Sequence, residues 1–336
     1  MNIYKEDGYL DVDSILSAGY TFNIIIGPRG TGKTYGFAKW LLTDHNHHIV
    51  YMRRTSAEIE IAASDEFNVF KKLSQDTGID IYFKRSKIGR KLFVGEDPRG
   101  FALPLSTFSN ARGFDASEIE FLLFDEFVPE HSKRSKISEA DTFFNAYETM
   151  NRNRELSGQD PIRCILCANS NNIDNDLFRA LGLVNIISKL SAKHVSTYAD
   201  PKRSLLVINI QDSPVSEQKR VTALYQLTGG DTDFDQMALG NTFTDLEEYK
   251  LKSASLAGAR PLWQIGGLIF YKLPGGLMYG SSHVSGSPRK VYEDTQSGRA
   301  KFLMDRGPKL VDRYLKNKLY FETAADEVYF RNVCRI

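Results

Sequence analysis

The sequence predicts an α/β fold in which helices cover both faces of a parallel β-sheet, followed by a smaller α+β domain. Apolar strand-like runs alternate with helical patterns through about residue 200, and a glycine-rich turn joins the first of these strands to the first helix. From about Trp263 onward the chain changes to short strand-like runs separated by glycine turns. Because 336 residues are many for one hydrophobic core, two domains are expected.

The glycine-rich turn, GPRGTGKT, matches the pattern G-x-x-x-x-G-K-[ST]. A β-branched strand, 22–26, precedes it, and apolar residues at helical spacing follow over 35–42. In this setting backbone N–H groups bind phosphate oxygens, the lysine reaches the β- and γ-phosphates, and the hydroxyl ligates Mg²⁺. The alternative is a glycine-rich turn with a surface lysine. The predicted nucleotide-binding residues are Gly27, Pro28, Arg29, Gly30, Thr31, Gly32, Lys33 and Thr34, with Thr34 also a metal ligand.

The rest of the first domain alternates in the same way. A helix is expected over 57–75, and another is expected to begin near Ser138, which is a plausible cap. The predicted strands are HHIVYMRR, IDIYF, KLFVG, EFLLFDEF and IRCILCA. Ligands of such sheets bind at the carboxyl ends of the strands, so the other site residues are sought there.

Two adjacent carboxylates, Asp125 and Glu126, follow the apolar run FLLF. Asp125 is predicted to hold Mg²⁺, and Glu126 is predicted to orient and deprotonate the water that attacks the γ-phosphorus. Alone, such a pair often marks a strand that enters a solvated turn, but a preceding phosphate loop favours the catalytic interpretation. The two motifs together are typical of ASCE, RecA-like P-loop NTPases and indicate ATP and Mg²⁺ as cofactors.

Asn169 ends the strand IRCILCA and is predicted to hydrogen-bond the γ-phosphate or the attacking water. The neighbouring Asn171 and Asn172 fit that role and the capping of a helix near Asp174 equally well.

Several arginines are candidates for neutralising charge on the transferred phosphoryl group. Arg152 and Arg154 end the helix that begins near Ser138, where the helix dipole and solvation ordinarily explain them. A ring-shaped ATPase, however, needs an arginine that one subunit inserts into the site of its neighbour. Arg29 is a candidate that acts within its own subunit, and Arg53 and Arg54 are expected to touch phosphate or a partner loop.

The formal charge of +1 excludes a strongly basic protein and leaves contacts with nucleic acid to local patches. The candidates are Lys84–Lys91 and His131–Lys136, although solvated loops explain such runs more often.

The two cysteines of the C-x-x-C pattern in RCILCA are expected to be core thiols. A signal-peptide start and a membrane-length apolar run are both missing from the sequence, so no membrane partner is expected.

Three segments are expected along the chain: a P-loop ATPase domain over 1–200, a linker or lid subdomain over 201–250, and a C-terminal domain over 251–336. The middle segment contains LLVINIQ and a polar helix candidate, SPVSEQKRVTALYQLTG. The last contains IGGLIFYKLPGGLMYG and an amphipathic stretch, KLVDRYLKNKLYF.

Taken together, GPRGTGKT, YMRR, FLLFDEF, RNRE, RCILCANS and GLMYGSSH resemble, in order and spacing, the genome-packaging ATPases of small tailed phages of the φ29 type. The resemblance implies a homo-oligomeric ring, a pentamer in that family, that works in the host cytoplasm and docks on the portal of an empty procapsid. Such a ring hydrolyses ATP to drive double-stranded DNA inward. The family roles fall on Lys33 and Thr34 for nucleotide and metal, Asp125 and Glu126 for metal and water, and Arg152 for the finger between subunits.

The resemblance also implies a C-terminal domain similar to a degenerate RNase H-like nuclease. Gly280 and Ser281 stand where a nuclease strand would supply its first metal-binding aspartate, so no nuclease activity is expected. A packaging RNA is left open as a further partner. The remaining alternatives are a helicase, a small-molecule kinase, and a nucleotide-gated structural adaptor of the portal that scarcely hydrolyses ATP.

Overall fold

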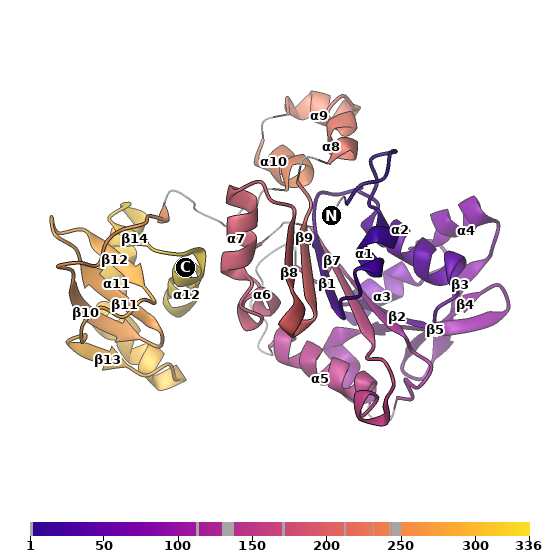
Figure 1. Cartoon of the computed structure of the whole chain (residues 1–336), viewed down its shortest axis with the longest axis horizontal. Coiled ribbons are helices and arrows are strands. Elements are labelled where there is room, and N and C mark those ends of the chain that lie inside the picture. The colour runs from indigo at the N-terminus through magenta and orange to yellow at the C-terminus, as the bar shows by residue number, and fades with distance from the viewer. Residues whose placement is uncertain are drawn as a thin grey trace. The chain divides into compact units, whose positions relative to one another are not determined.

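Figure 1 shows a computed structural model of the chain, which describes residues 3–111, 114–129, 138–169, 172–211, 213–230, 232–241, 243 and 250–336. The chain divides into two compact units, Met1–Ala180 with Lys189–Thr244 and Leu181–Ser188 with Asp245–Ile336. The basic run at 131–136 and Asn171 lie outside the described residues. Within the described ranges, no helix combines the length and apolar character needed to span a bilayer.

The first unit contains, in its described residues, a nine-stranded sheet of order β3-β4-β5-β2-β6-β7-β1-β9-β8. All strands from β5 to β9 in this order pair in parallel, and antiparallel pairing adds β3, β4 and β8 at the two edges. The predicted parallel sheet is thereby confirmed. Its strands are β1 (Phe22–Ile26), β2 (Ile49–Arg53), β3 (Ile81–Ser86), β4 (Gly89–Val94), β5 (Asp97–Pro104), β6 (Phe121–Asp125), β7 (Arg163–Ala168), β8 (Thr197–Asp200) and β9 (Leu205–Asn209).

Helices cover both faces of this sheet because side chains alternate along each strand. Ile25 and Leu123 belong to the core that α1 to α4 share with one face. Phe124 points the other way, and its ring centroid lies 5.9 Å from that of Phe143 on α5. Up to Ala180, the helices of the first unit are α1 (Val12–Ser17), α2 (Lys33–Lys39), α3 (Ser56–Ala62), α4 (Lys71–Thr77), α5 (Glu139–Asn151) and α6 (Asp176–Ala180), and a π-helical turn, Trp40–Asp44, extends α2. Helix α7 (Val184–Ala192) begins in the second unit and ends in the first.

The prediction of a single helix over 57–75 was wrong, because two shorter helices, α3 and α4, occupy this stretch. A capping box formed by Thr55 and Glu58 begins α3. After α3, the Ser64 hydroxyl donates to the carbonyl of Ile61 and accepts from the N–H of Phe67. Such local side-chain bonds compete with helical ones, so they explain the break.

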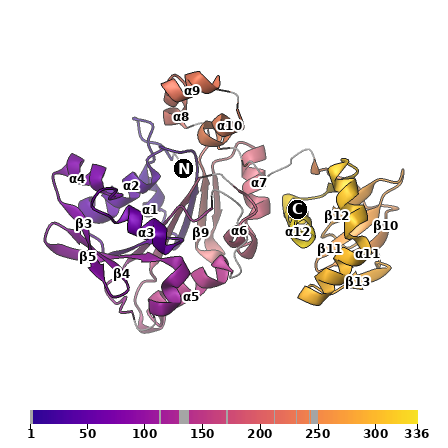
Figure 2. The same ribbon diagram turned by 180° about the vertical axis from the view of Figure 1, so that it is seen from behind.

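Strand β9 belongs to the large sheet, since it pairs in parallel with β1 from Phe22–Leu205 to Ile26–Asn209. The boundary expected at residue 200 therefore falls inside the β8–β9 hairpin. Every residue of β9 is buried, as in a central parallel strand. Beyond its carboxyl end lie three short helices, α8 (Pro214–Lys219), α9 (Ala223–Thr228) and α10 (Asp233–Gly240), which Figure 2 shows grouped together. One continuous helix was expected where α8 and α9 stand.

The second unit is a smaller α+β domain, as predicted. In its described residues the sheet has the order β13-β10-β11-β12-β14, with the middle three strands antiparallel and each outer strand parallel to its neighbour. Its elements are β10 (Arg260–Ile265), β11 (Leu268–Lys272), β12 (Met278–Ser281), β13 (Lys290–Tyr292), α11 (Gln296–Leu315), β14 (Leu319–Phe321) and α12 (Ala324–Cys334). The likeness to an RNase H-like nuclease stays a prediction.

Candidate nucleotide-binding site

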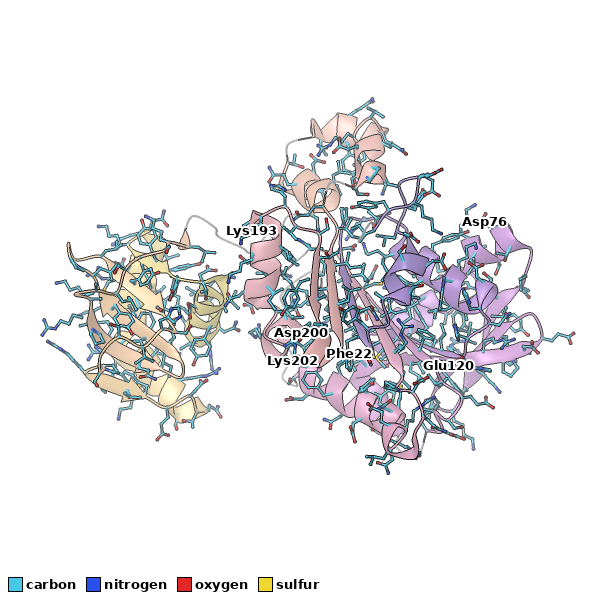
Figure 3. The ribbon with its side chains drawn as sticks, viewed as in Figure 1. Phe22, Asp76, Glu120, Lys193, Asp200 and Lys202 are labelled. Carbon is cyan, nitrogen blue, oxygen red and sulfur yellow. The ribbon has the colours of Figure 1, made fainter. Side chains whose placement is uncertain are left out.

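The predicted site residues meet at the carboxyl ends of three central strands of the large sheet, β1, β6 and β7. Phe22 and Glu120, labelled in Figure 3, mark the amino ends of β1 and β6, so the loop after β1 and the carboxylates after β6 lie at the opposite edge. A cavity of 430 Å³ opens there. It is lined by Arg29, Gly30, Gly32, Lys33, Thr34, Tyr35, Asp125, Glu126, Ala168 and Asn169.

The loop between β1 and α2 has the backbone that a phosphate loop requires. Gly30 and Gly32 have φ of 77° and 81°, in the left-handed region that side chains disfavour. Gly27 serves a different need: a Cβ atom there would lie 2.6 Å from the Cβ of Ile210, which follows β9. The first glycine of the motif is therefore required by packing against the neighbouring strand.

The Lys33 side chain is buried at the start of α2 and holds the loop from inside. Its ammonium donates to the carbonyls of Gly27 (2.8 Å) and Pro28 (2.7 Å) and to Oδ1 of Asn169 (3.2 Å). Burial lowers the pKa of Lys33 to about 8, although the nearby Asp125 and Glu126 favour the charged form. The side chains predicted to bind and to sense the γ-phosphate are thus in direct contact.

The two predicted magnesium ligands lie side by side, since the hydroxyl of Thr34 donates to Oδ1 of Asp125 at 2.9 Å. Both are hard oxygen donors on the wall of the cavity. Mg²⁺ is commonly held by one or two such groups together with substrate phosphates and water. The donor set therefore fits magnesium. Across the described residues, no group of three or more His, Cys, Asp and Glu side chains is arranged to hold a metal by itself.

Arg53, at the end of β2, bridges the two carboxylates. Its guanidinium bonds Oδ2 of Asp125 at 3.0 Å and forms an ion pair with Oε2 of Glu126. Tyr51 completes this network, because its hydroxyl donates to Asp125 and accepts from Nε of Arg53. Burial opposes the charge on Arg53, but attraction to Asp125 and Glu126 outweighs it and raises the pKa of the guanidinium. Glu126 itself has φ of 53°, unusual for a residue other than glycine.

The other candidate arginines lie outside this cavity, except Arg29. Arg54 pairs with Glu139 at 2.6 Å, at the start of α5. Arg152, at the end of α5, donates to the carbonyls of Thr149 and Phe114, and Arg154 donates to the carbonyls of Ala116 and Ile119. Both side chains therefore anchor the segment before β6 of the same chain.

Asn172 lies before α6, and Cys164 and Cys167 lie in β7. Asn172 donates to the carbonyl of Pro129 at 3.2 Å, and Asn175 caps α6 by accepting from the N–H of Phe178. Cys164 and Cys167 are buried, and burial raises the pKa of both thiols, so the expectation of core thiols is confirmed.

The basic run at 84–91 forms the ends of β3 and β4 at one edge of the sheet. The rings of Tyr82 and Phe93 stack there with centroids 5.2 Å apart, and the ammonium of Lys84 lies 5.2 Å and 4.8 Å from them. The ammonium of Lys91 lies 5.7 Å from the Phe93 ring. Strand pairing therefore gathers cations and aromatic rings that the sequence shows only as a run of charge.

Sequence reasoning missed two contributors to the site. Tyr51 reads as an ordinary strand residue, and only its place opposite Leu123 in the β2–β6 register brings it to Asp125. Lys219 lies far along the chain but donates to the carbonyl of Arg29 in the phosphate loop at 2.6 Å. A motif search has no signal for either, because both depend on the tertiary arrangement.

A phosphate loop on β1, with β7 between it and the carboxylate strand β6, places the chain among the P-loop NTPases. More narrowly, it belongs to the podovirus DNA encapsidation proteins (Gp16), whose family model matches residues 5–255. The resemblance drawn from the motifs is thereby confirmed.

Individual relatives agree with this family. The chain is 29% identical over 238 residues to the DNA packaging protein of Bacillus phage B103, an alignment that covers 69% of this chain and 67% of the relative. It is 26% identical over 241 residues to the DNA packaging protein of Bacillus phage phi29, covering 70% of this chain and 66% of the relative. The alignments thus span about two thirds of these relatives' own length.

Solved structures show the same fold. A chain of the bacteriophage Phi-29 viral genome packaging motor assembly aligns with a TM-score of 0.70 and 19% identity over 97% of this chain and 98% of that one. The N-terminal domain of the DNA packaging ATPase from bacteriophage phi29 aligns with a TM-score of 0.50 and 24% identity over 61% of this chain and 97% of that one. Both units of the chain therefore follow a known architecture.

Proposed function

We propose that this chain hydrolyses ATP to drive double-stranded viral DNA into a procapsid, as one subunit of a homo-oligomeric ring docked on the portal. The observation that carries the proposal is the meeting of Lys33, Thr34, Asp125 and Glu126 around one cavity, in a chain that belongs to the DNA encapsidation family. The ring assembles in the host cytoplasm and is pentameric in this proposal. The phi29 motor assembly, similar in fold, supports work within a larger complex.

Each site residue has a chemical task in this proposal. The backbone N–H groups of the loop and the ammonium of Lys33 bind the phosphates, while Thr34 and Asp125 would hold Mg²⁺. Bound magnesium would neutralise charge on the phosphate oxygens. Asn169 hydrogen-bonds the γ-phosphate or the attacking water. Most of the rate acceleration then comes from positioning and electrostatics.

Glu126 orients the attacking water and accepts its proton. Its side chain is 55% exposed, so solvent water reaches it, and its Oε2 forms an ion pair with Arg53. The carboxylate therefore has to turn away from Arg53 before both of its oxygens can bind water.

Arg29 and Arg152 are the proposed charge-neutralising arginines, within the subunit and across the ring. Arg29 lines the cavity. The Arg152 side chain is held by two backbone carbonyls of its own subunit, so it exchanges these bonds for phosphate oxygens of its neighbour.

The second unit contacts DNA or the portal without cutting DNA. Gly280 and Ser281 lie in β12, which therefore supplies no carboxylate of its own at this position. The Ser281 hydroxyl donates to the carboxylate of Glu322, which follows β14. Two-metal cleavage requires several converging carboxylates.

ATP hydrolysis by concentrated protein, with and without duplex DNA, tests the proposal. Duplex should stimulate hydrolysis, and Lys33→Ala and Glu126→Gln should both abolish the stimulated rate, whereas Glu126→Gln should still bind ATP. Hydrolysis that ignores duplex at every protein concentration would contradict a DNA motor. Hydrolysis unaffected by Glu126→Gln would contradict the assigned base.

A further inference from the structure

Lys219 brings a second lysine to the phosphate loop, from the three-helix segment α8 to α10. Its ammonium donates to the carbonyl of Arg29 at 2.6 Å. A Cβ atom on Gly30 would lie 1.9 Å from this ammonium. The Lys219 side chain therefore rests directly on the bare backbone of the loop, in space that only a glycine leaves open.

The surroundings of Lys219 compensate its charge incompletely. Desolvation lowers the pKa of Lys219, and among the described residues no carboxylate forms a salt bridge with it. The next residue differs, since Arg220 pairs with Glu217 at 3.1 Å. An anion that replaces the carbonyl of Arg29 would stabilise this half-buried ammonium further, because a hydrogen bond between two charged groups is stronger than one to a neutral carbonyl.

The position of Lys219 along the loop indicates which anion this is. The N–H groups at the start of α2, near Lys33, cradle the phosphates closer to the nucleoside. Lys219 approaches the opposite part of the loop, at Arg29 and Gly30. Burial is the main cause of the lowered pKa of Lys33, and repulsion from the charge of Lys219 lowers this pKa further. The two ammonium groups therefore lie close enough to serve one phosphate chain.

We propose that Lys219 binds the γ-phosphate of ATP, as a second phosphate-binding lysine next to Lys33. This inference rests on the proposed ATPase function and adds a residue that no sequence motif identifies. It also gives the α8–α10 segment a direct contact with the nucleotide, so that this segment responds to whether the terminal phosphate is attached.

Nucleotide affinity of the full chain tests the inference, with calorimetry or a fluorescent analogue of ATP and of ADP. Lys219→Ala should weaken ATP binding about tenfold, as expected for one charge-assisted contact, and should change ADP binding less than twofold. Lys219→Arg should restore most of the ATP affinity. Arg220→Ala, the matched control, removes a neighbouring cation that does not touch the loop and should leave both affinities unchanged.

The possible outcomes distinguish a failure of the Lys219 assignment from a failure of the proposed ATPase function. If wild-type protein binds ATP, Lys33→Ala abolishes binding and Lys219→Ala has no effect, the inference fails while the ATPase proposal stands. An equal loss for ATP and ADP would overturn the γ-phosphate assignment. If the wild-type chain does not bind ATP, the proposed function itself fails. Recovery with Lys219→Arg shows that a loss in Lys219→Ala is not a folding defect.

Discussion

Lys33 is a buried lysine whose ammonium is held by the oxygens of Gly27, Pro28 and Asn169. These dipoles stabilise its charge less well than phosphate does, so the pKa near 8 belongs to the site before phosphates enter. Bound phosphate raises this pKa again. Nucleotide affinity is therefore linked to protonation of Lys33.

The affinity for ATP should fall as pH rises through about 8. Below that pH Lys33 is already charged in the free protein, and binding takes up no proton at this group. Above it Lys33 is neutral, and binding must first recruit a proton. Calorimetry in buffers of different ionisation enthalpy should show proton uptake at pH 9 and none from Lys33 at pH 6.5. A flat affinity across this range would contradict the assignment, and Lys33→Arg, always charged, should flatten the profile if it binds.

Removing the hydroxyl next to Asp125 should weaken use of magnesium. Thr34→Ala deletes one of the two proposed ligands while leaving the loop backbone intact, so the Mg²⁺ concentration for half-maximal hydrolysis should rise about tenfold. Thr34→Ser keeps the hydroxyl and is the control. A magnesium titration of ATP hydrolysis measures both, and equal behaviour of the two variants would argue against Thr34 as a ligand.

At the scale of elements, two adjacent phenylalanines of α5 differ in how they pack on the sheet. Phe143 is 2% exposed and packs on Phe124, whereas its neighbour Phe144 is 39% exposed. Phe143→Ala should lower the free energy of unfolding by about 3 to 4 kcal/mol, since it opens a cavity at the sheet. Phe144→Ala, on the same helix, should cost less than about 1 kcal/mol. Urea unfolding of the two variants measures the difference, and similar losses would contradict this packing.

The β3–β4 hairpin carries the basic run at 84–91, one of the two candidate contacts with duplex DNA. Lys84→Ala with Lys91→Ala should weaken duplex binding and lower the magnitude of the slope of log affinity against log salt by about 2, because each lysine contributes about one phosphate contact. The control removes two exposed lysines elsewhere in the unit, Lys193→Ala with Lys202→Ala, both labelled in Figure 3. Equal salt slopes in the two double variants would place the DNA contact elsewhere.

The sequence predicted what is local in the chain. The phosphate loop, its helix and the acidic strand end each form a contiguous pattern, so Lys33, Thr34 and Asp125 could be proposed as site residues from the sequence alone. Register and long-range packing are invisible in such patterns. Arg53 was expected to touch phosphate or a partner loop, and its bridge between Asp125 and Glu126 follows from the β2–β6 pairing. The break between α3 and α4 was missed because an apolar periodicity continues through it.

At the scale of the whole molecule, the chain has a net charge near zero and two compact units. The first unit carries the candidate nucleotide site, and the second has a hydrophobic core of its own. Composition could suggest the two units, but not that β9 completes the first of them. The boundary was placed before a strand that pairs with β1. Burial on both faces gives such a strand a short apolar run, LLVI, and from sequence alone this run fits a strand in a linker subdomain equally well.

Assembly should make one subunit depend on the arginine of another. In rings mixed from wild-type and Arg152→Ala subunits, each variant subunit should silence the site of its neighbour while its own ATP binding survives. If the sites hydrolyse ATP in a coupled order, the hydrolysis rate of the mixed rings should fall more steeply than in proportion to the fraction of variant subunits. Arg154→Ala is the control, since it holds the same segment through similar carbonyl bonds. A loss confined to the variant's own site would assign the role to Arg29.

The contact between Gly27 and Ile210 has a consequence for how this sequence can evolve. Ile210 sits where a side chain at position 27 would have to go, and its N–H bonds the carbonyl of Ile26 at 2.7 Å. Alanine at position 27 is thus excluded by a residue far along the chain. Because the nearest atom is a Cβ, which every residue except glycine carries, a shorter side chain at position 210 does not remove the clash. Descendants of this chain should therefore keep glycine at position 27 even where phosphate binding has been lost, as long as position 210 is not itself glycine.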